Sequence, residues 1–398
     1  MLSARVLYLS FDGVLTPLGY SQIVRPLIEL ARRGVRYTLV TLETGLDDAA
    51  AVDRLRATFK DAGIVWKALP FSAGGGAVAF AKNSARMLGA ALAAGRHDLV
   101  HARSVQAASA GAMVKRIWRR PLLFDTRGFW ADQRALQGLL SPRTAALARV
   151  LERSAYAACD GAVMLTELGV DEVRSGRFGA FAKPIVCITT CVDDRAFTMA
   201  RRREDTVPSA IREALRDKRV VGFVGSVNAD YEVDASLALF RRVRAHDANA
   251  RLLVLTAQAD ALRDRLRTAA IDPSAAIVTT APHVEMPAWL NWIDWGLLLL
   301  RADHPAKHAS MPTKLGELFA CGVRPVHYGC NAELAAWVTR AGSGITLPAL
   351  DASALDAAAH AIVDAAPADL AAARARTMPH FSLLGAVDRY LRVYEALV

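Results

Sequence analysis

Residues Met311 to Val326 read MPTKLGELFACGVRPV, and this stretch decides the fold of the chain around it. Pro312 and Thr313 suit the start of a helix, because a missing or capped N–H costs nothing in the first turn. Apolar side chains then recur at the spacing of one helical face, and Gly322 ends the helix. The valines on either side of Pro325 begin a buried strand. A helix that leads directly into a buried strand is typical of an α/β protein.

Lys314 and Glu317 project from nearly the same side of this helix, because they are three residues apart. A helix N-terminus that carries a lysine favours a phosphate, and a glutamate one turn later can accept two hydrogen bonds from a sugar diol. These residues, with Thr313 beside them, are therefore candidate ligand-binding residues. The alternative is an ordinary surface helix with an exposed Lys–Glu pair, which contributes little to stability.

The stretch resembles the nucleotide-sugar motif of GT-B glycosyltransferases of the family 4 type, which begins PTK-x-x-E-x-x-A-x-G. The resemblance implies that Lys314 meets the donor diphosphate and that Glu317 holds the ribose hydroxyls. Many members carry a second glutamate eight residues earlier, near the sugar and the catalytic centre, and this chain has Ala309 there. An active transferase and a catalytically silent relative both remain open.

Length and composition fit a globular protein of two domains. The chain has 398 residues, of which 53% are hydrophobic and 22% are charged, so a disordered chain is excluded. No apolar run reaches the roughly 18–20 residues of a membrane span, and no signal peptide precedes the first strand, so the expected location is the cytoplasm. Five cysteines without paired CxxC spacing disfavour disulfides and a zinc site.

The net charge of +10 favours acidic partners such as phosphates or an anionic membrane surface. The basic run Lys115–Arg120 and a predicted helix at 77–95 favour a peripheral contact with the inner face of a membrane. A solvated helix end is the alternative explanation for such a run. No zinc-finger spacing or RNP-type aromatic motif accompanies the charge, so nucleic acid is not an expected partner.

The chain opens with a predicted βαβ unit. Arg5–Ser10 is an apolar run typical of a buried strand, a helix follows Gln22, and Tyr37–Leu42 is the next strand. This order indicates a right-handed crossover and a Rossmann-like sheet. The glycines of the first loop lack GxGxxG spacing, which disfavours an NAD enzyme.

The same loop resembles the DG…GxSQ opening of family 4 glycosyltransferases, which lies over the donor phosphates and the acceptor. The resemblance makes Gly19 and Ser21 candidate donor-binding residues. A plain turn between strand and helix is the alternative.

Two further predicted strands end in ionisable side chains, the first in His101 and Arg103 and the second in Asp125 and Arg127. Because the carboxyl ends of parallel strands face the ligand crevice, these four side chains should converge there. The second strand end resembles the D-x-RG-x-W variant of polysaccharide-biosynthesis members, where many relatives carry a catalytic histidine. We therefore take Asp125, Arg127 and His101 as catalytic candidates, although a polar strand end often only caps the next helix.

A second buried strand with glycines at its end, Val220–Gly225, predicts a second Rossmann-like domain. Relatives carry an arginine and a lysine beyond this strand, both on the diphosphate. Here the loop offers Ser226 and Asn228, which can donate hydrogen bonds to phosphate but carry no charge. Three residues are candidate substitutes for the missing cation: Lys307, Arg103 and Arg127.

A later loop in the family brackets the nucleotide base, and by resemblance His283 and Val284 are candidate donor-binding residues. A surface-loop histidine is the alternative for His283. Thr166 follows another predicted strand and is expected to face the crevice.

The arginine-rich run near residues 195–207 is predicted to link two domains. The first spans 1–200 and includes a C-terminal helix at 380–398, which resembles the helix that crosses back onto the first domain in GT-B enzymes. The second, donor-binding domain spans 207–379. The expected fold class is α/β of the GT-B type, with two facing Rossmann-like domains.

The resemblance implies an enzyme that moves a sugar from a UDP- or GDP-sugar to a hydroxyl acceptor, with retention of configuration and without a cofactor or required metal. The expected acceptor is a glycan, a lipid-linked saccharide or a small molecule in surface polysaccharide or glycoconjugate biosynthesis. One alternative is a silent GT-B paralogue that binds a sugar nucleotide or a partner enzyme. A sugar-nucleotide epimerase is another, and the sequence offers no acid–base carboxylate set for it.

Overall fold

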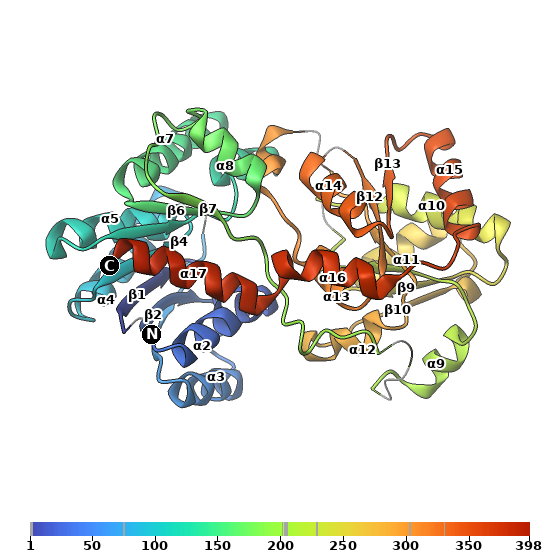
Figure 1. Ribbon diagram of the computed structural model, residues 1–398, viewed down its shortest axis with the longest axis horizontal. Coiled ribbons are helices and arrows are strands. Elements are labelled where there is room, and N and C mark those ends of the chain that lie inside the picture. The colour runs from blue at the N-terminus through green and yellow to red at the C-terminus, as the bar shows by residue number, and fades with distance from the viewer. Residues whose placement is uncertain are drawn as a thin grey trace. The chain divides into compact units, whose positions relative to one another are not determined.

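The computed structural model describes residues 3–74, 76–200, 202, 206–227, 230–301, 304–329 and 331–398. The chain divides into two compact units (Figure 1). The N-terminal unit comprises Met1–Cys191, Ala306–Ser310 and Leu383–Val398, and the C-terminal unit comprises Val192–Pro305 and Met311–Ser382.

The first change of unit falls at Val192, before the linker predicted near residues 195–207. Val192 donates its N–H to the carbonyl of Phe381 at 2.9 Å, and both residues belong to the C-terminal unit. The short segment Ala306–Ser310 returns to the N-terminal unit, which no sequence pattern predicted.

Within the described residues, the N-terminal unit holds a parallel sheet of seven strands in the order β3-β2-β1-β4-β5-β6-β7. The strands are β1 (Arg5–Ser10), β2 (Arg36–Glu43), β3 (Val65–Pro70), β4 (Leu99–Arg103), β5 (Leu122–Asp125), β6 (Gly161–Met164) and β7 (Ile185–Cys187). Most of these strands are apolar along their length because a parallel sheet is covered on both faces.

Helices cover the two faces of this sheet in two layers. The helices of the unit are α1 (Pro17–Gly19), α2 (Arg25–Arg32), α3 (Ala49–Asp61), α4 (Ala77–Leu92), α5 (Val105–Trp118), α6 (Trp130–Leu136), α7 (Pro142–Ala158), α8 (Glu167–Arg174) and α17 (Leu383–Leu397). One apolar core lies between the sheet and α2, α3 and α17. A second core lies between the opposite face and α4, α5, α7 and α8. A π-helical turn, Tyr20–Val24, and a 3-10 turn, Pro305–Ala309, complete the regular structure around this unit.

The C-terminal unit repeats the architecture with six described parallel strands in the order β10-β9-β8-β11-β12-β13. They are β8 (Val220–Val224), β9 (Arg251–Leu255), β10 (Ala276–Thr279), β11 (Trp295–Leu298), β12 (Arg324–Tyr328) and β13 (Ile345–Leu347). The α-helices are α9 (Ser209–Leu215), α10 (Val233–His246), α11 (Ala259–Thr268), α12 (Met286–Leu290), α13 (Thr313–Ala320), α14 (Ala332–Ala341), α15 (Ala352–Val363) and α16 (Leu370–Phe381), with 3-10 turns at Pro273–Ala275 and His283–Glu285. The predicted α/β class with two Rossmann-like sheets is confirmed.

The stretch that opened the sequence analysis forms α13 and β12 as predicted. Pro312 is the N-cap residue of α13, and Gly322 follows the helix with φ of 68°, the left-handed conformation that favours glycine. Leu315, Leu318 and Phe319 are buried on the inner face of the helix.

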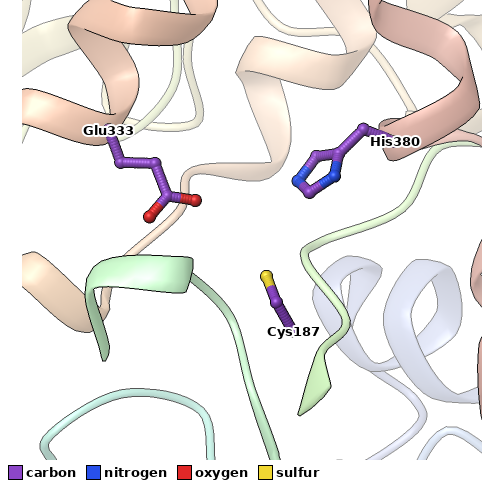
Figure 2. A group of neighbouring side chains, drawn as sticks. All are labelled: Cys187, Glu333 and His380. Atoms are coloured by element: carbon purple, nitrogen blue, oxygen red, sulfur yellow. The ribbon is translucent and has the colours of Figure 1, made fainter. Parts of the chain in front are cut away.

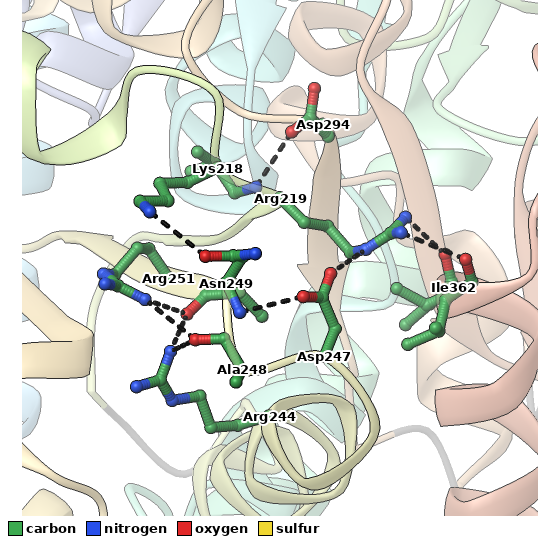
Figure 3. A network of polar contacts seen from close by, with 12 residues as sticks. Lys218, Arg219, Arg244, Asp247, Ala248, Asn249, Arg251, Asp294 and Ile362 are labelled. Carbon is green, nitrogen blue, oxygen red and sulfur yellow. Dashed lines mark hydrogen bonds and ion pairs between the residues drawn. The ribbon is translucent and has the colours of Figure 1, made fainter.

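A polar network fixes the amino edge of the C-terminal sheet (Figure 3). Arg219 precedes β8, and its guanidinium binds Asp247 Oδ2 at 2.8 Å and the carbonyls of Ile362 and Val363 at 2.9 and 3.0 Å. Asp294 Oδ2 accepts the N–H of Val220 at 2.8 Å. These bonds join the ends of α10 and α15 to the start of β8. The polar side chains at this end of the sheet therefore stabilise the fold.

No helix among the described residues is both long enough and apolar enough to span a bilayer.

Candidate functional site

The candidate donor residues gather around α13 in the C-terminal unit. Helix α13 starts after β11 and has no capping side chain at Pro312, so its first turn can offer backbone N–H groups to an anion. Lys314 lies over the loop that follows β8: a Cβ built on Gly225 would be 2.8 Å from Lys314 Cε and 3.2 Å from its Nζ. Gly225 has φ of 142°, so both its backbone and its neighbour favour glycine.

The loop after β8 lacks the basic residues that relatives carry there. Lys314, which the resemblance already assigned to the diphosphate, reaches this loop from α13. Lys307, one of the candidate substitutes, lies in the segment Ala306–Ser310, which belongs to the N-terminal unit.

Glu317 lies one turn further along α13, beside His283. His283 Nε2 is 3.4 Å from Glu317 Oε1, and the two side chains come from the turn after β10 and from α13. Glu317 is buried, whereas the His283 side chain is about a third exposed. Lys314 and Glu317 also line one small pocket with apolar residues of β8, β11 and the neighbouring helices: Gly222, Val224, Leu290, Gly296, Leu297, Leu298 and Leu318.

The remaining donor candidates are less closely grouped. Thr313 is half-buried at the first position of α13, and Ser226 is exposed in the loop after β8. Val284 is 84% exposed, so its side chain makes little contact with the rest of its unit. Asn228 lies outside the described residues.

The catalytic candidates of the N-terminal unit converge near the carboxyl ends of β4 and β5, where His101 and Asp125 are sealed from solvent. His101 is 1% exposed and Asp125 is 0% exposed. His101 Nε2 is 3.4 Å from Asp125 Oδ2, and its Nδ1 is 2.7 Å from Tyr394 Oη. Tyr390 Oη donates to Asp125 Oδ2 at 2.8 Å. Both tyrosines belong to α17, which therefore closes over this strand end.

The electrostatics of this network follow from its burial and its two arginines. Burial alone would raise the pKa of the Asp125 carboxyl, but Arg127, His101 and Arg103 together hold that pKa well below its usual range. Burial lowers the pKa of His101 despite the neighbouring carboxylate. The ring is therefore neutral near pH 7, with geometry suited to accept from Tyr394 at Nδ1 and to donate to Asp125 at Nε2.

The two arginines connect the network to its surroundings. Arg127 Nη1 is 3.3 Å from Asp125 Oδ1, and the Arg127 side chain remains 15% exposed. Arg103 Nη1 is 3.7 Å from Asp125 Oδ2, and its Nε is 3.4 Å from Oδ2 of the exposed Asp12. Of the predicted catalytic residues, Arg127 alone retains appreciable exposure in its own unit.

The first loop is a tightly bonded turn. A Cβ on Gly19 would collide with the backbone oxygen of Gly13, and the Gly19 N–H donates to Thr16 Oγ1 at 3.0 Å. Ser21 Oγ donates to the carbonyl of Leu18 at 3.2 Å. The glycine is thus explained by close packing within the loop, and no geometry here assigns either residue to a ligand.

The position of the missing family glutamate lies in the segment Ala306–Ser310. Ala309 is fully buried in the apolar core of the N-terminal unit. Thr166 Oγ1 donates to the carbonyl of His308 at 2.6 Å, and Gln133 Nε2 donates to Ser310 Oγ at 2.7 Å. Thr166 also caps α8, so its hydroxyl holds this segment and this helix and is not free for a crevice.

Figure 2 shows another polar pair, Glu333 on α14 and His380 on α16. The His380 ring stacks on Trp337 with centroids 4.2 Å apart, which fits a helix-packing role. Cys187, also drawn there, belongs to the N-terminal unit, so the three residues are not a ligand set within one unit.

Several residues that organise these regions were missed from the sequence. Tyr390 and Tyr394 lie about 265 and 293 residues from their partners, and only their period along the last helix hinted that they are buried. Glu43 accepts the N–H groups of Val14 and Leu15 at 2.9 and 3.2 Å and so fixes the first loop. A carboxylate at the end of an apolar strand was the available signal.

This chain is similar to known proteins in both sequence and structure. Residues 19–189 match the family model of the "Glycosyl transferase 4-like domain". Sucrose-phosphate synthase from Thermosynechococcus elongatus is similar over 99% of this chain and 98% of its own, with 14% identity and a TM-score of 0.71. HepE from Anabaena, solved with UDP and glucose, is similar over 99% of this chain and 100% of its own, with 14% identity and a TM-score of 0.68.

A UDP-N-acetylglucosamine 2-epimerase is also similar over 100% of this chain and 97% of its own, with 10% identity and a TM-score of 0.65. A search of curated proteins finds no match. The structural likeness confirms the predicted GT-B fold, and the family match confirms the predicted resemblance.

Proposed function

We propose that this chain, which shares the GT-B fold of its solved neighbours and matches a glycosyltransferase family model over residues 19–189, moves a sugar from a nucleotide sugar to a hydroxyl acceptor with retention of configuration. No cofactor or metal is part of this proposal. UDP is the first donor nucleotide to test, because HepE was solved with UDP and glucose, and GDP is the second. The proposed acceptor is a glycan, a lipid-linked saccharide or a small molecule of surface polysaccharide or glycoconjugate biosynthesis.

The observation that carries the proposal is the grouping of Lys314, Glu317 and His283 around the start of α13. The ammonium of Lys314 over the glycine turn after β8 suits a diphosphate, helped by the first-turn N–H groups of α13. Glu317 presents carboxylate oxygens to a ribose diol, and His283 lies 3.4 Å from that carboxylate.

The chemistry requires charge stabilisation more than a strong base. The bond between the sugar C1 and the donor phosphate oxygen breaks, a bond from C1 to the acceptor oxygen forms, and the acceptor proton leaves to the phosphate or to water. The departing diphosphate gains negative charge, which Lys314 and the α13 N-terminus would stabilise. Because those groups are held by the helix, they need little reorganisation during the reaction.

In the N-terminal unit we propose that Arg127 contacts a ligand. Asp125 and His101 would hold the Arg127 side chain in position. Asp125 lies 3.3 Å from Arg127 Nη1, and it is itself fixed by His101 and Tyr390. With both ring nitrogens of His101 engaged, a role as general base would require the network to open.

One observation favours a second candidate function. Ala309 occupies the place of a family glutamate near the sugar, and its methyl group is packed in the apolar core. A chain that lacks this carboxylate could bind a sugar nucleotide, or a partner enzyme, without transferring the sugar.

A panel of UDP-, GDP-, ADP- and TDP-sugars, each incubated with and without a candidate acceptor, separates these functions. Release of nucleoside diphosphate that depends on acceptor supports transfer, and it should persist in EDTA. Binding without consumption would support the silent alternative. Conversion of the sugar nucleotide without acceptor and without diphosphate release would indicate an epimerase.

The same proposal places the reaction at the inner, cytoplasmic face of a membrane. Fractionation of cells that express the full chain tests this location: recovery with the membrane fraction, released by high salt, is expected for a peripheral protein.

A further inference from the structure

Three helices of the N-terminal unit, α4, α5 and α7, carry very few acidic residues. Helices α2, α3 and α17 together carry seven arginines and lysines and five acidic residues. On the other face of the sheet, α4, α5 and α7 carry seven arginines and lysines and one acidic residue, Glu152, whereas α8 on the same face carries one arginine and three acidic residues. Glu152 is fully buried and accepts the N–H groups of Trp130 and Ala131. The outer surface of α4, α5 and α7, here named the basic face, therefore presents cations without an exposed carboxylate from those helices.

The same basic face exposes large apolar side chains. Among the described residues, six such side chains lie on these three helices: Val78, Leu92, Met113, Ile117, Leu147 and Val150. The described part of α2, α3 and α17 has none, and Val284 is the only one among the described residues of the C-terminal unit. Met113 and Ile117 are four residues apart on α5, and Leu147 and Val150 are three apart on α7, so each pair lies on one helical side.

A basic pocket adjoins this apolar surface. Its lining includes four cations at and just beyond the end of α5, Lys115, Arg116, Arg119 and Arg120, together with Pro121 and Asp160. Lys115 Nζ is 2.6 Å from Asp160 Oδ1, so this lysine neutralises the carboxylate of the pocket. Among the described residues, the three arginines have no ion-pair partner, so their charge is available to a phosphate.

We propose that the basic face binds the surface of a bilayer that contains anionic phospholipid. The apolar side chains would enter the boundary between headgroups and acyl chains, while the arginines would contact lipid phosphates in and around the pocket. Helix α5 packs against both α4 and α7, so the three helices are neighbours (Figure 1). The inference rests on the proposed membrane location and names the surface and the lipid chemistry for it. It requires no nucleotide, so its failure would be distinguishable from failure of the proposed transfer reaction.

Nucleic acid is the competing partner for a basic surface. Proteins that bind single strands stack bases on aromatic side chains, and no exposed aromatic residue occurs among the described residues of α4, α5 and α7. Exposed aliphatic residues beside arginines fit a membrane interface better, because aliphatic groups gain free energy there by leaving water.

The test measures sedimentation of the full-length protein with vesicles of phosphatidylcholine, alone or with about a third phosphatidylglycerol. We expect binding only to the anionic vesicles. The variant Arg116→Gln/Arg119→Gln/Arg120→Gln should reduce the partition coefficient about 100-fold, because each cation near an anionic surface contributes about fivefold. Ile117→Ser, at a 59% exposed position, should reduce it about fivefold to tenfold.

The matched control removes three exposed cations from the opposite face, as Arg54→Gln/Arg56→Gln/Lys60→Gln on α3. It changes the net charge equally and should alter binding less than threefold. An equal loss in both triple variants would show that net charge alone acts, and it would overturn the assignment of the basic face. Absence of vesicle binding, equal binding to neutral vesicles, or salt-sensitive binding of DNA or RNA in place of vesicles would also overturn it. Unchanged thermal unfolding of each variant shows that the losses are not due to misfolding.

Discussion

The carboxyl ends of the two sheets carry similar polar residues in opposite settings. In the N-terminal unit, His101 and Asp125 are closed beneath α17 and bonded to its tyrosines. In the C-terminal unit, Lys314 and Glu317 line a pocket, and His283 beside them is partly exposed. We call the carboxyl end of the N-terminal sheet, with His101 and Asp125, the braced edge. We call the carboxyl end of the C-terminal sheet, with Lys314, Glu317 and His283, the open edge.

The difference shows that convergence of ionisable residues at strand ends does not by itself identify a ligand site. Parallel strands bring such residues together in both units, but the next layer of structure decides whether they meet solvent. In the N-terminal unit, Tyr390 and Tyr394 of α17 bond to Asp125 and His101, and this closed network supports Arg127. The set in the C-terminal unit is only partly enclosed: Glu317 is buried, but Lys314 and His283 remain partly exposed.

Removal of the central carboxylate should have the largest effect on the braced edge. Asp125→Ala leaves Arg103 and Arg127 without their buried counter-charge, and we expect it to lower the free energy of unfolding by about 3–5 kcal/mol. Urea unfolding of the variant measures this loss. Stability within about 0.5 kcal/mol of the wild type would contradict the description of a braced edge.

Removal of the cation should weaken the open edge in a ligand-dependent way. Lys314→Ala should reduce the binding free energy of UDP by about 1.5–3 kcal/mol, because a charged hydrogen bond to the diphosphate is lost. Uridine lacks phosphate and should bind both proteins alike. Calorimetric titration compares them, and equal losses for UDP and uridine would argue against a diphosphate contact.

The free energy of unfolding should depend on pH through the buried histidines of the two units. Burial lowers the pKa of His327 on β12 to about 4, whereas His101 has a carboxylate that partly offsets burial. A histidine with a depressed folded pKa contributes stability above its unfolded pKa of about 6.5, and this stability is lost as the pH falls towards 4. Between pH 6.5 and pH 5 the loss from His327 is about 2 kcal/mol.

The variant His327→Phe should therefore show a smaller decrease in unfolding free energy over this interval, by about 2 kcal/mol. Urea unfolding at several pH values measures the slope for both proteins. Parallel slopes would show that His327 does not titrate between the folded and unfolded states in this way.

The smallest expected effect is the loss of one tyrosine hydroxyl. Tyr394→Phe removes the donor to His101 Nδ1 and the partner of Tyr37, 3.1 Å away, and should cost about 1 kcal/mol. Leu391→Ala, a change in the partly buried apolar part of α17, serves as the comparison for general loosening of the helix. No measurable cost for Tyr394→Phe would indicate that water replaces the hydroxyl.

The sequence predicted those features that depend on local pattern. Pro312, Gly322 and the apolar stripe between them marked α13 correctly, and Gly225 marked the turn after β8. The strand ends at His101 and Asp125 were also predicted to converge, and they do.

Features that depend on distant parts of the chain could not be predicted in the same way. Whether Asp125 is open or closed depends on hydroxyl groups of α17 far along the chain, and helical periodicity predicts burial without naming a partner. The cation over the β8 loop comes from α13, since a long flexible lysine can reach a neighbouring strand end. The segment Ala306–Ser310 carries no pattern that assigns it to the N-terminal unit.

The central claim is that the open edge binds the nucleotide and the braced edge does not. Calorimetric titration of UDP, and of GDP if UDP is silent, into the wild type, Glu317→Gln and Tyr390→Phe tests it most directly. We expect Glu317→Gln to weaken binding about tenfold or more and Tyr390→Phe to leave the dissociation constant within about twofold. Unchanged affinity in Glu317→Gln, or a large loss confined to Tyr390→Phe, would contradict the account.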